Sequence, residues 1–376
     1  MAYTEIESLE QLHAYLDERG TLAGAAVQGL DLRYQGETLR AASTAGAVFL
    51  GCRMEAEAHA HLDGAGALVL PPLPPLPYRP FRPRLYTADE LMEGYVRGDH
   101  HSFARATADG AIYTHYALFR KTDAPVPILE ALSQRIHDHA IDDAMYDLLH
   151  NGGDPRRVVA IMGGHGMKRE EPAFLTVART ARALTREGYF VTSGGGPGAM
   201  EAANLGAYFA AHADADLVWA VGSMAQANDY HAVGYFDRAY DVRDRFPEGA
   251  ESLAIPTWFY GHEPANIFAS HIAKYFANSI REDGLLAIAR HGVIFAPGSA
   301  GTIQEIFQDA TQNHYVTFGQ MSPMVFFGEQ YWTENKPVYP LLRDLAAGRP
   351  YARLITICDE ADEMVAFIKS HPPEEV

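Results

Sequence analysis

Three glycine-rich segments in the second half of the chain could bind a phosphate group. Each directly follows a short apolar run: Gly163-Gly-His-Gly166, Gly194-Gly-Gly-Pro-Gly198 and Pro297-Gly-Ser-Ala-Gly301. Glycine allows positive φ and lets backbone N–H groups approach an anion without a Cβ in the way. A helix that begins directly after such a loop adds unpaired N–H groups and the positive end of its dipole. Three loops of this kind favour a phosphate or nucleotide site.

The third loop continues into Thr302 and Glu305, whose side chains could do more than bind an anion. The Thr302 hydroxyl can face a phosphate, and Glu305 would lie in the first turn of the following helix, near the same pocket. The Thr-x-x-Glu spacing is also that of a capping box, in which Glu305 only accepts the N–H of the cap residue. On spacing alone, the capping box is the favoured interpretation.

Two common nucleotide sites find no support in these loops. None of the loops is followed by Gly-Lys-Ser/Thr, so a Walker-type triphosphate site is not expected. Residues 194–199 fit the Gly-x-Gly-x-x-Ala dinucleotide pattern, which also needs an acidic residue at the end of the next strand. We take 217–221 as that strand, and it ends in Gly222-Ser-Met-Ala-Gln226. An NAD site is therefore not expected, and no cofactor is predicted.

Short apolar runs that alternate with helical stretches predict how the loops are positioned. The runs expected to form strands are 158–162, 189–192, 217–221, 293–296, 323–327 and 354–357. Strands alternating with helices indicate a parallel sheet with helices on both faces. We therefore predict an α/β fold, a Rossmann-like doubly wound parallel sheet, over residues 151–376. Ligands in such folds bind at the carboxyl ends of the strands.

Residues 1–150 lack this regular alternation of apolar runs and helical stretches, and they are expected to form a smaller α+β domain. Apolar residues spaced by three and four predict an amphipathic helix over 5–19, and 125–150 also read as helical. Between these lies a short irregular β segment, in which apolar residues recur every five positions: Leu22, Val27 and Leu32, then Phe49 and Met54.

Two further segments punctuate this first domain. Residues 71–83 are proline-dense and predict an extended polyproline arm. The arm could be a ligand for an SH3-type domain, but packing over the protein's own surface is favoured. Asn151-Gly-Gly-Asp-Pro155 breaks the helical pattern and marks the boundary between the two domains.

The composition excludes several classes of protein. The chain of 376 residues has 48 Asp and Glu against 30 Lys and Arg, a formal charge of −18, so binding to nucleic acid is not expected. No run approaches the roughly 20 apolar residues of a membrane span, so no membrane partner is expected. The acidic N-terminus lacks signal-peptide features, and two cysteines suit a reducing compartment. We expect a cytoplasmic protein.

Histidines and lysines offer weaker candidates. The pairs His137/His139 and His100/His101 are expected to be solvated surface residues, and no metal site is predicted. His165 lies in a glycine loop, where contact with a phosphate or base and a structural hydrogen bond are equally good interpretations. A pyridoxal enzyme needs a Schiff-base lysine. The lysines are Lys121, Lys168, Lys274, Lys336 and Lys369, and only Lys168 lies just past a glycine loop, with no partner for a pyridine ring.

The segment Pro297-Gly-x-x-Gly-Thr-x-x-Glu305 resembles the Pro-Gly-Gly-x-Gly-Thr-x-x-Glu signature of the LOG family. Three further segments are similar to the larger bacterial branch of that family, the pyrimidine/purine nucleotide 5′-monophosphate nucleosidases. They are Gly163-Gly-His165, Gly196-Pro-Gly-Ala-Met-Glu201 and Glu263-Pro-Ala-Asn266, in family order over roughly residues 155–370. Members are often labelled lysine decarboxylases, a label that the lysine pattern does not support.

The resemblance implies a catalytic pair and a set of substrate-binding residues. The family's catalytic glutamate corresponds to Glu305, and its arginine to Arg281, with Arg290 as the alternative. The substrate-binding residues would be Gly163, Gly164, His165, Gly194, Gly195, Gly196, Gly198, Met200, Asn266, Gly298, Ser299, Gly301 and Thr302. The chain departs from the pattern in two places, since Ser299 replaces a glycine and Gln304 replaces a residue that is commonly Glu.

By resemblance, the expected activity is hydrolysis of the N-glycosidic bond of a nucleoside 5′-monophosphate, by a homo-oligomer such as a dimer or tetramer. The alternative is a nucleotide sensor or carrier that uses the same loops without turnover. The insert between Val221 and Ile255 is rich in Tyr, His, Asp and Arg. It could select the base, make a subunit contact, or form a core-facing aromatic cluster.

Overall fold

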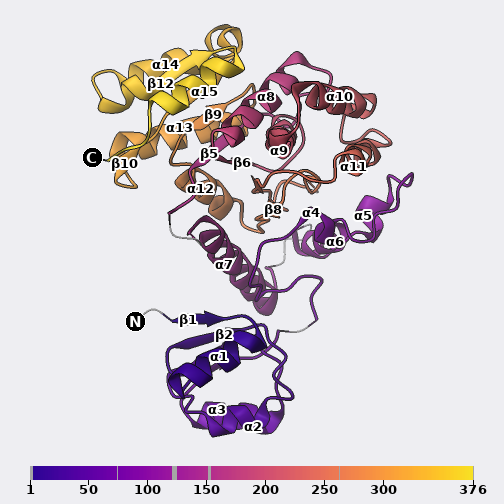
Figure 1. The fold of residues 1–376 in the computed structure, drawn as a ribbon, viewed down its shortest axis with the longest axis vertical. Helices are drawn as coiled ribbons and strands as arrows, with labels where there is room; N and C mark the ends of the chain where they lie inside the picture. Colours follow the sequence, from indigo (N-terminus) through magenta and orange to yellow (C-terminus); the bar gives the residue numbers. More distant parts are fainter. Residues whose placement is uncertain (1–2, 74, 121–124, 151–153, 262, 376) are drawn as a thin grey trace. The chain divides into compact units, whose positions relative to one another are not determined.

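The computed structural model describes residues 3–375 except 74, 121–124, 151–153 and 262 (Figure 1). The contacts divide the chain into two compact units, each made of two stretches of sequence. The first unit comprises Met1–Leu85 and Phe119–Asp147, and the second comprises Tyr86–Leu118 and Leu148–Val376. Of the predicted boundary segment 151–155, residues 151–153 lie outside the described residues. Residues 86–118, predicted to belong to the N-terminal domain, are part of the second unit.

In the first unit, strands and helices alternate strictly. The order is β1 (Thr4–Ile6), α1 (Leu9–Arg19), β2 (Ala25–Gln28), α2 (Gly36–Ala41), β3 (Val48–Leu50), α3 (Ala56–Gly64) and β4 (Leu68–Leu70). The four strands are parallel and lie in the sheet in the order of the sequence, β1-β2-β3-β4. Ser8 begins α1 with a reciprocal capping box to Gln11, which explains why the helix starts later than its apolar pattern.

A repeat in the sequence underlies this sheet. Ala-Gly-Ala occurs at residues 23–25, 45–47 and 65–67, where β2, β3 and β4 begin. The three glycines have φ of 77°, 77° and 84° and stack by backbone hydrogen bonds of 3.2 Å from Gly24 to Gly46 and from Gly46 to Gly66. The apolar spacing of five therefore belongs to a longer repeat of about 20–22 residues. The expected irregular β segment is wrong, because the strands form a regular sheet.

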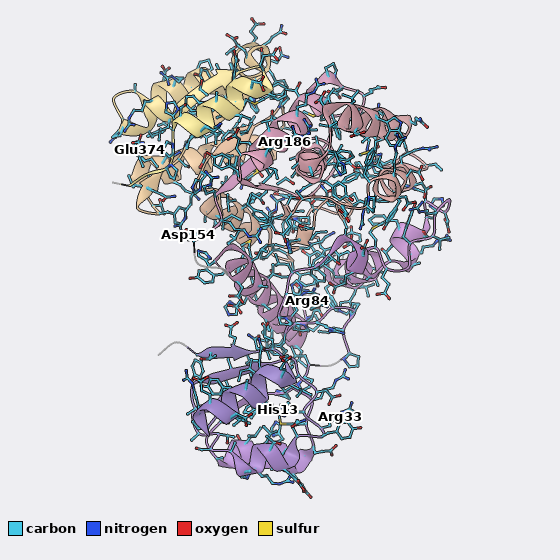
Figure 2. All side chains as sticks on the ribbon, viewed as in Figure 1. His13, Arg33, Arg84, Asp154, Arg186 and Glu374 are labelled. Carbon is cyan, nitrogen blue, oxygen red and sulfur yellow. The ribbon has the colours of Figure 1, made fainter. Side chains whose placement is uncertain are left out.

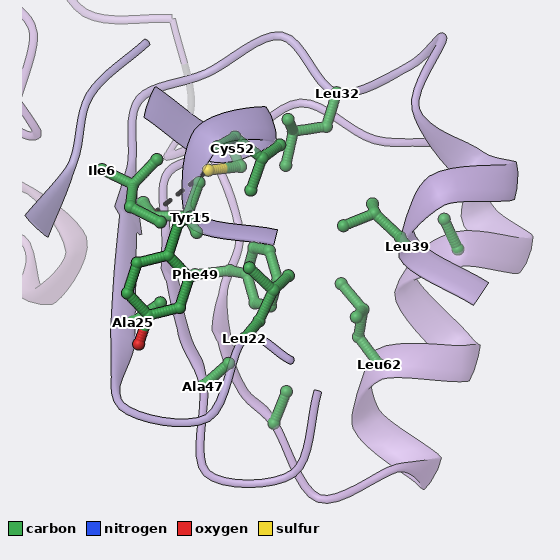
Figure 3. Packing of buried hydrophobic residues seen from close by; sticks show 14 residues of the cluster. Ile6, Tyr15, Leu22, Ala25, Leu32, Leu39, Ala47, Phe49, Cys52 and Leu62 are labelled. Atoms are coloured by element: carbon green, nitrogen blue, oxygen red, sulfur yellow. Dashed lines mark hydrogen bonds between the residues drawn. The ribbon is translucent and has the colours of Figure 1, made fainter. Parts of the chain in front are cut away.

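The core of the first unit lies between this sheet and its helices (Figure 3). Leu22, Val27, Leu32 and Phe49 are fully buried there, with Leu39 and Leu62 from α2 and α3. The buried Cys52 thiol donates to the Val27 carbonyl at 3.3 Å, which Figure 3 marks.

The proline-dense arm, residues 71–83, contains no helix or strand in its described part and packs on its own unit. Tyr78 and Arg82 are buried, and the Tyr78 hydroxyl donates to Glu130 at 2.9 Å. Glu130 belongs to α7 (Ile128–His150), the helix predicted over 125–150. Phe81 lies against Gly51, where a Cβ would come within 2.2 Å of its ring. The arm thus covers the carboxyl ends of β2 and β3.

The second unit contains a seven-stranded sheet in the order β12-β11-β9-β5-β6-β7-β8, with every pairing between these strands parallel. Its strands are β5 (Val158–Met162), β6 (Phe190–Ser193), β7 (Leu253–Ala254), β8 (His271–Ile272), β9 (Val293–Phe295), β11 (Met324–Phe327) and β12 (Ile355–Cys358). The chain enters at β5, runs outward to β8, and returns to β9 on the other side of β5. This is the predicted doubly wound α/β fold, with its switch point between β5 and β9.

Helices cover both faces of this sheet. One contiguous group is α8 (Pro172–Arg186), α9 (Ala199–Tyr208) and α15 (Ala361–Ser370), and the other is α12 (Asn278–Ile288), α13 (Ala300–Tyr315) and α14 (Val338–Ala346). Arg186, labelled in Figure 2, donates to the carbonyls of Ala210 and His212 and so joins α8 to the turn after α9.

The remaining elements are short or lie outside the main sheet. They are α4 (Ala88–Leu91), α5 (Ser102–Ala106), α6 (Ala108–Arg120), η1 (Phe209–Ala211), α10 (Asp214–Met224), η2 (Ala225–Ala227), α11 (Tyr235–Arg245), β10 (Gln320–Met321), η3 (Tyr331–Asn335), η4 (Pro350–Leu354) and β13 (Glu374–Glu375). None of the helices within the described parts of the chain is both long and apolar enough to cross a membrane.

One predicted strand is wrong. Residues 217–221 lie inside the helix α10, whose first turn carries Asp214 and Asp216, and the Asp216 carboxylate accepts the Ala213 N–H at 3.2 Å. The strand that follows β6 along the chain is instead β7. The argument against an NAD site therefore loses its premise. The carboxyl end of β7 continues as Ile255-Pro-Thr257, which also lacks a carboxylate.

Residues 86–118 join the second unit through a buried charge pair. The Lys274 ammonium lies 2.8 Å from Asp109 of α6 and donates to the Glu263 carbonyl at 2.7 Å. The Trp258 indole also donates to Asp109 at 2.8 Å, and all three side chains are fully buried. A buried charge is tolerated only with such partners, so the pair ties α6 to the segment after β8.

Candidate active site

The three glycine loops meet at the switch point of the second sheet. The loop after β5 is joined to the loop after β9 by a hydrogen bond of 2.9 Å from Gly164 N–H to the Pro297 carbonyl. The Ala199 N–H, which follows the loop after β6, donates to the Gly164 carbonyl at 3.3 Å. A Cβ on Gly198 would lie 2.5 Å from that carbonyl, so the close approach requires glycine. The structure brings together the three segments that the sequence selected.

The loop after β9 leads directly into α13, and its shape depends on Gly298. A Cβ at Gly298 would lie 2.1 Å from the Thr302 hydroxyl and 3.0 Å from the Gly164 nitrogen. Ser299 is the N-cap residue, so the unpaired N–H groups of the first turn belong to residues 300–302. Thr302 is buried in that turn, next to Gly298.

The capping-box interpretation of Thr302 and Glu305 is wrong. The helix begins at Ala300 with Ser299 as its cap, so Thr302 is already inside the first turn. Glu305 faces α12 instead, where its carboxylate lies 3.5 Å from the Arg281 guanidinium. Arg290, the alternative, is exposed beyond the end of α12, where its Nε donates to Ala287 at 3.4 Å. Geometry therefore selects Arg281 as the partner of Glu305.

Two more carboxylates influence Glu305. Burial raises the pKa of Glu305 to about 7; Arg281 opposes this shift, and the negative charges of Glu282 and Glu263 reinforce it. Glu282 is buried and accepts hydrogen bonds from Asn278 at 2.6 Å, Gln304 at 2.5 Å and Tyr260 at 3.1 Å. Gln304 thus serves as a donor to Glu282, a role that an ionised glutamate at this position could not fill.

Two buried arginines of this unit differ in how their donors are used. Arg169 is 1% exposed and makes a bidentate pair with Glu201, at 2.9 and 2.5 Å, and also donates to the carbonyls of Ala227 and Tyr235. Arg281 is 6% exposed, but its one polar contact within the described chain is the 3.5 Å approach to Glu305, and its Nε has no partner there. A buried guanidinium with unused donors is suited to bind an anionic or hydroxyl-rich ligand.

Arg169 is a residue that the sequence analysis missed, and it fixes the insert between 221 and 255. Its guanidinium also lies 3.6 Å from the centre of the Tyr235 ring. In that insert Tyr235 and Phe236 are buried, which fits the aromatic-cluster interpretation. Asp229 and Tyr230 line a small pocket with His165 and Gly198. The same insert thus contributes both to the core and to a pocket beside two of the glycine loops.

The other predicted site residues have more local partners. Met200 packs against the loop after β6, where its sulfur would lie 2.7 Å from a Cβ on Gly194. The Asn266 amide donates to Asn204 at 3.0 Å and accepts the Phe268 N–H at 3.0 Å, so it braces α9 and its own loop. His165 is exposed. Lys336, which the sequence analysis did not select, lies 3.1 Å from the Ser299 hydroxyl.

The histidine pairs differ from expectation in one respect. His137 is fully buried beside Asp138 rather than solvated, and the Tyr78 ring meets it edge-on at 5.6 Å. His139 and His101 are exposed and His100 is half-buried. Within the described parts of the chain, no three His, Cys, Asp or Glu side chains come together as metal ligands.

Comparison with known proteins yields structural similarity only. No family model matches the chain, and no curated protein matches it. A solved structure of the molybdenum cofactor binding protein from the phototrophic bacterium Rippkaea orientalis is 13% identical, covers 57% of this chain and 96% of that chain, and has a TM-score of 0.35. The structure of the Moco carrier protein from Chlamydomonas reinhardtii is 12% identical, covers 57% of this chain and 96% of that chain, and has a TM-score of 0.36. Both similarities extend over little more than half of this chain, so a functional assignment has to rest on the site.

Proposed function

We propose that this chain hydrolyses the N-glycosidic bond of a nucleoside 5′-monophosphate, releasing the free base and ribose 5-phosphate. The observation that carries the proposal is the buried Arg281, whose Nε has no partner among the described residues, beside Glu305 and three glycine loops at a switch point. The resemblance of residues 297–305 to the LOG signature supports the same activity.

The 5′-phosphate would bind at the N-terminus of α13. The N–H groups of the first turn and the Thr302 hydroxyl supply donors, and the helix dipole favours the negative charge. The other two glycine loops would close the opposite wall. Arg281 would then use its free donors on the ribose or the phosphate.

Glu305 would act on the ribose carbon that carries the base. Cleavage passes through a ribosyl cation, which a nearby carboxylate stabilises as in glycoside hydrolysis. Ionised Glu305 would take a proton from water while the hydroxide adds to C1′, and the bond electrons leave with the base, which is protonated in turn. Because the pKa of Glu305 is about 7, both of its protonation states are accessible near neutral pH.

The direct test is to incubate the protein with a panel of nucleoside monophosphates and measure free base by chromatography. We expect base release from at least one member, and its loss in Glu305→Gln with nucleotide binding retained. Glu360→Gln, an exposed carboxylate on the same unit, is the control and should keep full activity. Tight binding of a nucleotide without base release from any member would favour the sensor or carrier instead.

A dimer or tetramer, which the resemblance implies, is part of the proposal. Light scattering on the purified chain would measure the mass in solution, and a monomer at working concentration would remove that part alone.

A further inference from the structure

A π-helical turn after β11 contacts the glycine loop that follows β9. This turn, η3, follows the strand next to β9, and its Trp332 indole donates to the last carbonyl of β9, that of Phe295, at 3.1 Å. Trp332 is fully buried, so the turn is anchored on the sheet. π-helical turns are rare and are often found at functional sites.

Two side chains of this segment converge on the same carbonyl group. The Tyr331 hydroxyl donates to the Gly298 carbonyl at 2.5 Å, and the Lys336 ammonium donates to it at 3.3 Å and to the Ser299 hydroxyl at 3.1 Å. Tyr331 and Lys336 are separated by one turn of the π-helix, since the Lys336 N–H donates to the Tyr331 carbonyl at 2.7 Å. The turn therefore places both side chains on one side, against the loop.

The position of Lys336 is electrostatically unusual. Its ammonium lies beside the N-cap of a 16-residue helix, where the dipole repels a cation and favours an anion. The other lysines in the described parts of the chain, Lys168, Lys274 and Lys369, each pair with a carboxylate. Lys336 has no such partner there, although acidic residues outnumber basic ones by 48 to 30.

The donors of Lys336 also leave room for a ligand. An ammonium group has three N–H donors. Two are directed at Gly298 and Ser299, and the third has no hydrogen-bond acceptor among the described residues. Independently, the buried Arg281 has an Nε without a partner among the described residues and lies against the same helix through Glu305. Both observations favour an anion-binding site near the start of α13.

We propose that Lys336 is a phosphate-binding residue, positioned by Ser299 and Tyr331, which supplies the countercharge for a phosphate monoester at the N-terminus of α13. Ser299, the departure from the signature glycine, then has a role: its hydroxyl orients the ammonium. The assignment of this phosphate to a nucleotide rests on the proposed function, whereas the binding of a phosphate monoester does not.

The test is binding of ribose 5-phosphate and inorganic phosphate, measured by calorimetry without any turnover. We expect Lys336→Met to weaken ribose 5-phosphate binding about tenfold or more, as expected for a charge-assisted hydrogen bond. Lys336→Arg should keep most of the affinity. The difference between wild type and Lys336→Met should shrink in high salt, because screening weakens the charge contribution. Equal affinity of wild type and Lys336→Met would overturn the proposal.

A purely structural role for Lys336 predicts a different pattern. Tyr331→Phe removes the other hydrogen bond to the Gly298 carbonyl and leaves the charge in place. If Lys336 only braced the loop, both variants would weaken binding equally at every salt concentration, which would also contradict the proposal. The proposal would also be contradicted if the affinity of the wild-type protein for ribose 5-phosphate did not change with salt concentration. This measurement needs no variant.

The two proposals fail in different ways. If no nucleotide releases base, but Lys336→Met still loses affinity for ribose 5-phosphate, the hydrolase proposal fails and Lys336 remains a phosphate ligand. If base is released and Lys336→Met leaves both the KM and the ribose 5-phosphate affinity unchanged, only the role of Lys336 is refuted.

Discussion

The two parallel sheets of this chain differ in the order in which the chain visits their strands. In the first unit the order is that of the sequence, so each crossover steps in the same direction. In the second unit the chain starts in the middle at β5 and later returns to β9 beside it. Only the second arrangement makes two neighbouring loops turn away in opposite directions, which opens a crevice at the strand ends.

The strand ends also differ in what lies over them. In the first unit the polyproline arm covers them, with Phe81 against Gly51 and its carbonyl against Gly29. In the second unit the glycine loops lie against each other, through Gly164 and Pro297, and a helix N-terminus follows. Glycines after parallel strands therefore do not by themselves make a binding site. Strand order decides which ones do.

A glycine substitution in each sheet should show the difference between the two sheets most clearly, because only one of the two should affect ligand binding. Gly298→Ala places a Cβ 2.1 Å from the Thr302 hydroxyl and should distort the glycine loop after β9. If the distortion removes two charge-assisted hydrogen bonds between the loop and the phosphate, ribose 5-phosphate binding would weaken about 100-fold. Gly46→Ala, at φ 77° in open space, should lower stability by about 1–2 kcal/mol and leave binding unchanged. Calorimetry and thermal unfolding would measure both. Equal effects on binding would contradict the comparison.

A core truncation tests whether the first sheet contributes to the site. Leu62 is fully buried on α3, and Leu62→Ala should cost about 2–5 kcal/mol of unfolding free energy. Ribose 5-phosphate affinity of the folded protein should stay the same. Leu345→Ala, exposed on α14, is the control and should change stability by less than about 0.5 kcal/mol. Urea unfolding and calorimetry provide the readouts, and a parallel loss of affinity would show that the first unit shapes the site.

One buried carboxyl group should make the stability of the second unit depend on pH. Burial raises the pKa of Asp309 on α13 to about 8. The folded form then keeps its proton between about pH 4 and 8 while the unfolded form loses it, so this group lowers stability by roughly 1.4 kcal/mol per pH unit across that window. The stability of Asp309→Asn should therefore increase relative to that of wild type as pH rises from 5 to 8.

Thermal unfolding at several pH values would measure this difference. Asp344→Asn, an exposed carboxylate on α14, is the matched control and should follow wild type. The interpretation of Asp309 would have to be abandoned if its variant showed the same pH dependence as wild type.

A smaller effect concerns the pH profile of the reaction. Ionised Glu282 raises the pKa of Glu305, so Glu282→Gln should lower it. If ionised Glu305 is the base, kcat/KM of wild type falls below about pH 7, and in Glu282→Gln this fall moves to lower pH. The measurement is base release against pH, with Glu360→Gln as the control. An unchanged midpoint would mean that another group limits the rate.

Much of the second unit was readable from the sequence because its strands are continuous apolar runs that end in glycine loops. Five of six expected strands are present, within a residue or two at each end. The exception, 217–221, shows the limit of this reading, since a short apolar run fits a buried helix equally well. Asp214 and Asp216 just before it were the signal for a helix start.

The contacts that complete the site could not be read in this way. Arg281 and Glu305 were found through a signature, whereas Lys336 lies 37 residues from Ser299 and meets it only because β11 pairs with β9. The Arg169 side chain likewise donates hydrogen bonds to carbonyls up to 66 residues away in the sequence. In the first unit the repeated Ala-Gly-Ala was visible in the sequence, and a search for repeats would have predicted its regular sheet.

The buried pair of Asp109 and Lys274 has a consequence for the order of folding during synthesis. The two residues are 165 positions apart, so Asp109 leaves the ribosome long before its partner. An ionised carboxylate cannot enter a dry interior alone. We therefore expect residues 86–118 to remain at the surface of the growing chain, and the second unit to close over α6 only once residue 274 has been made.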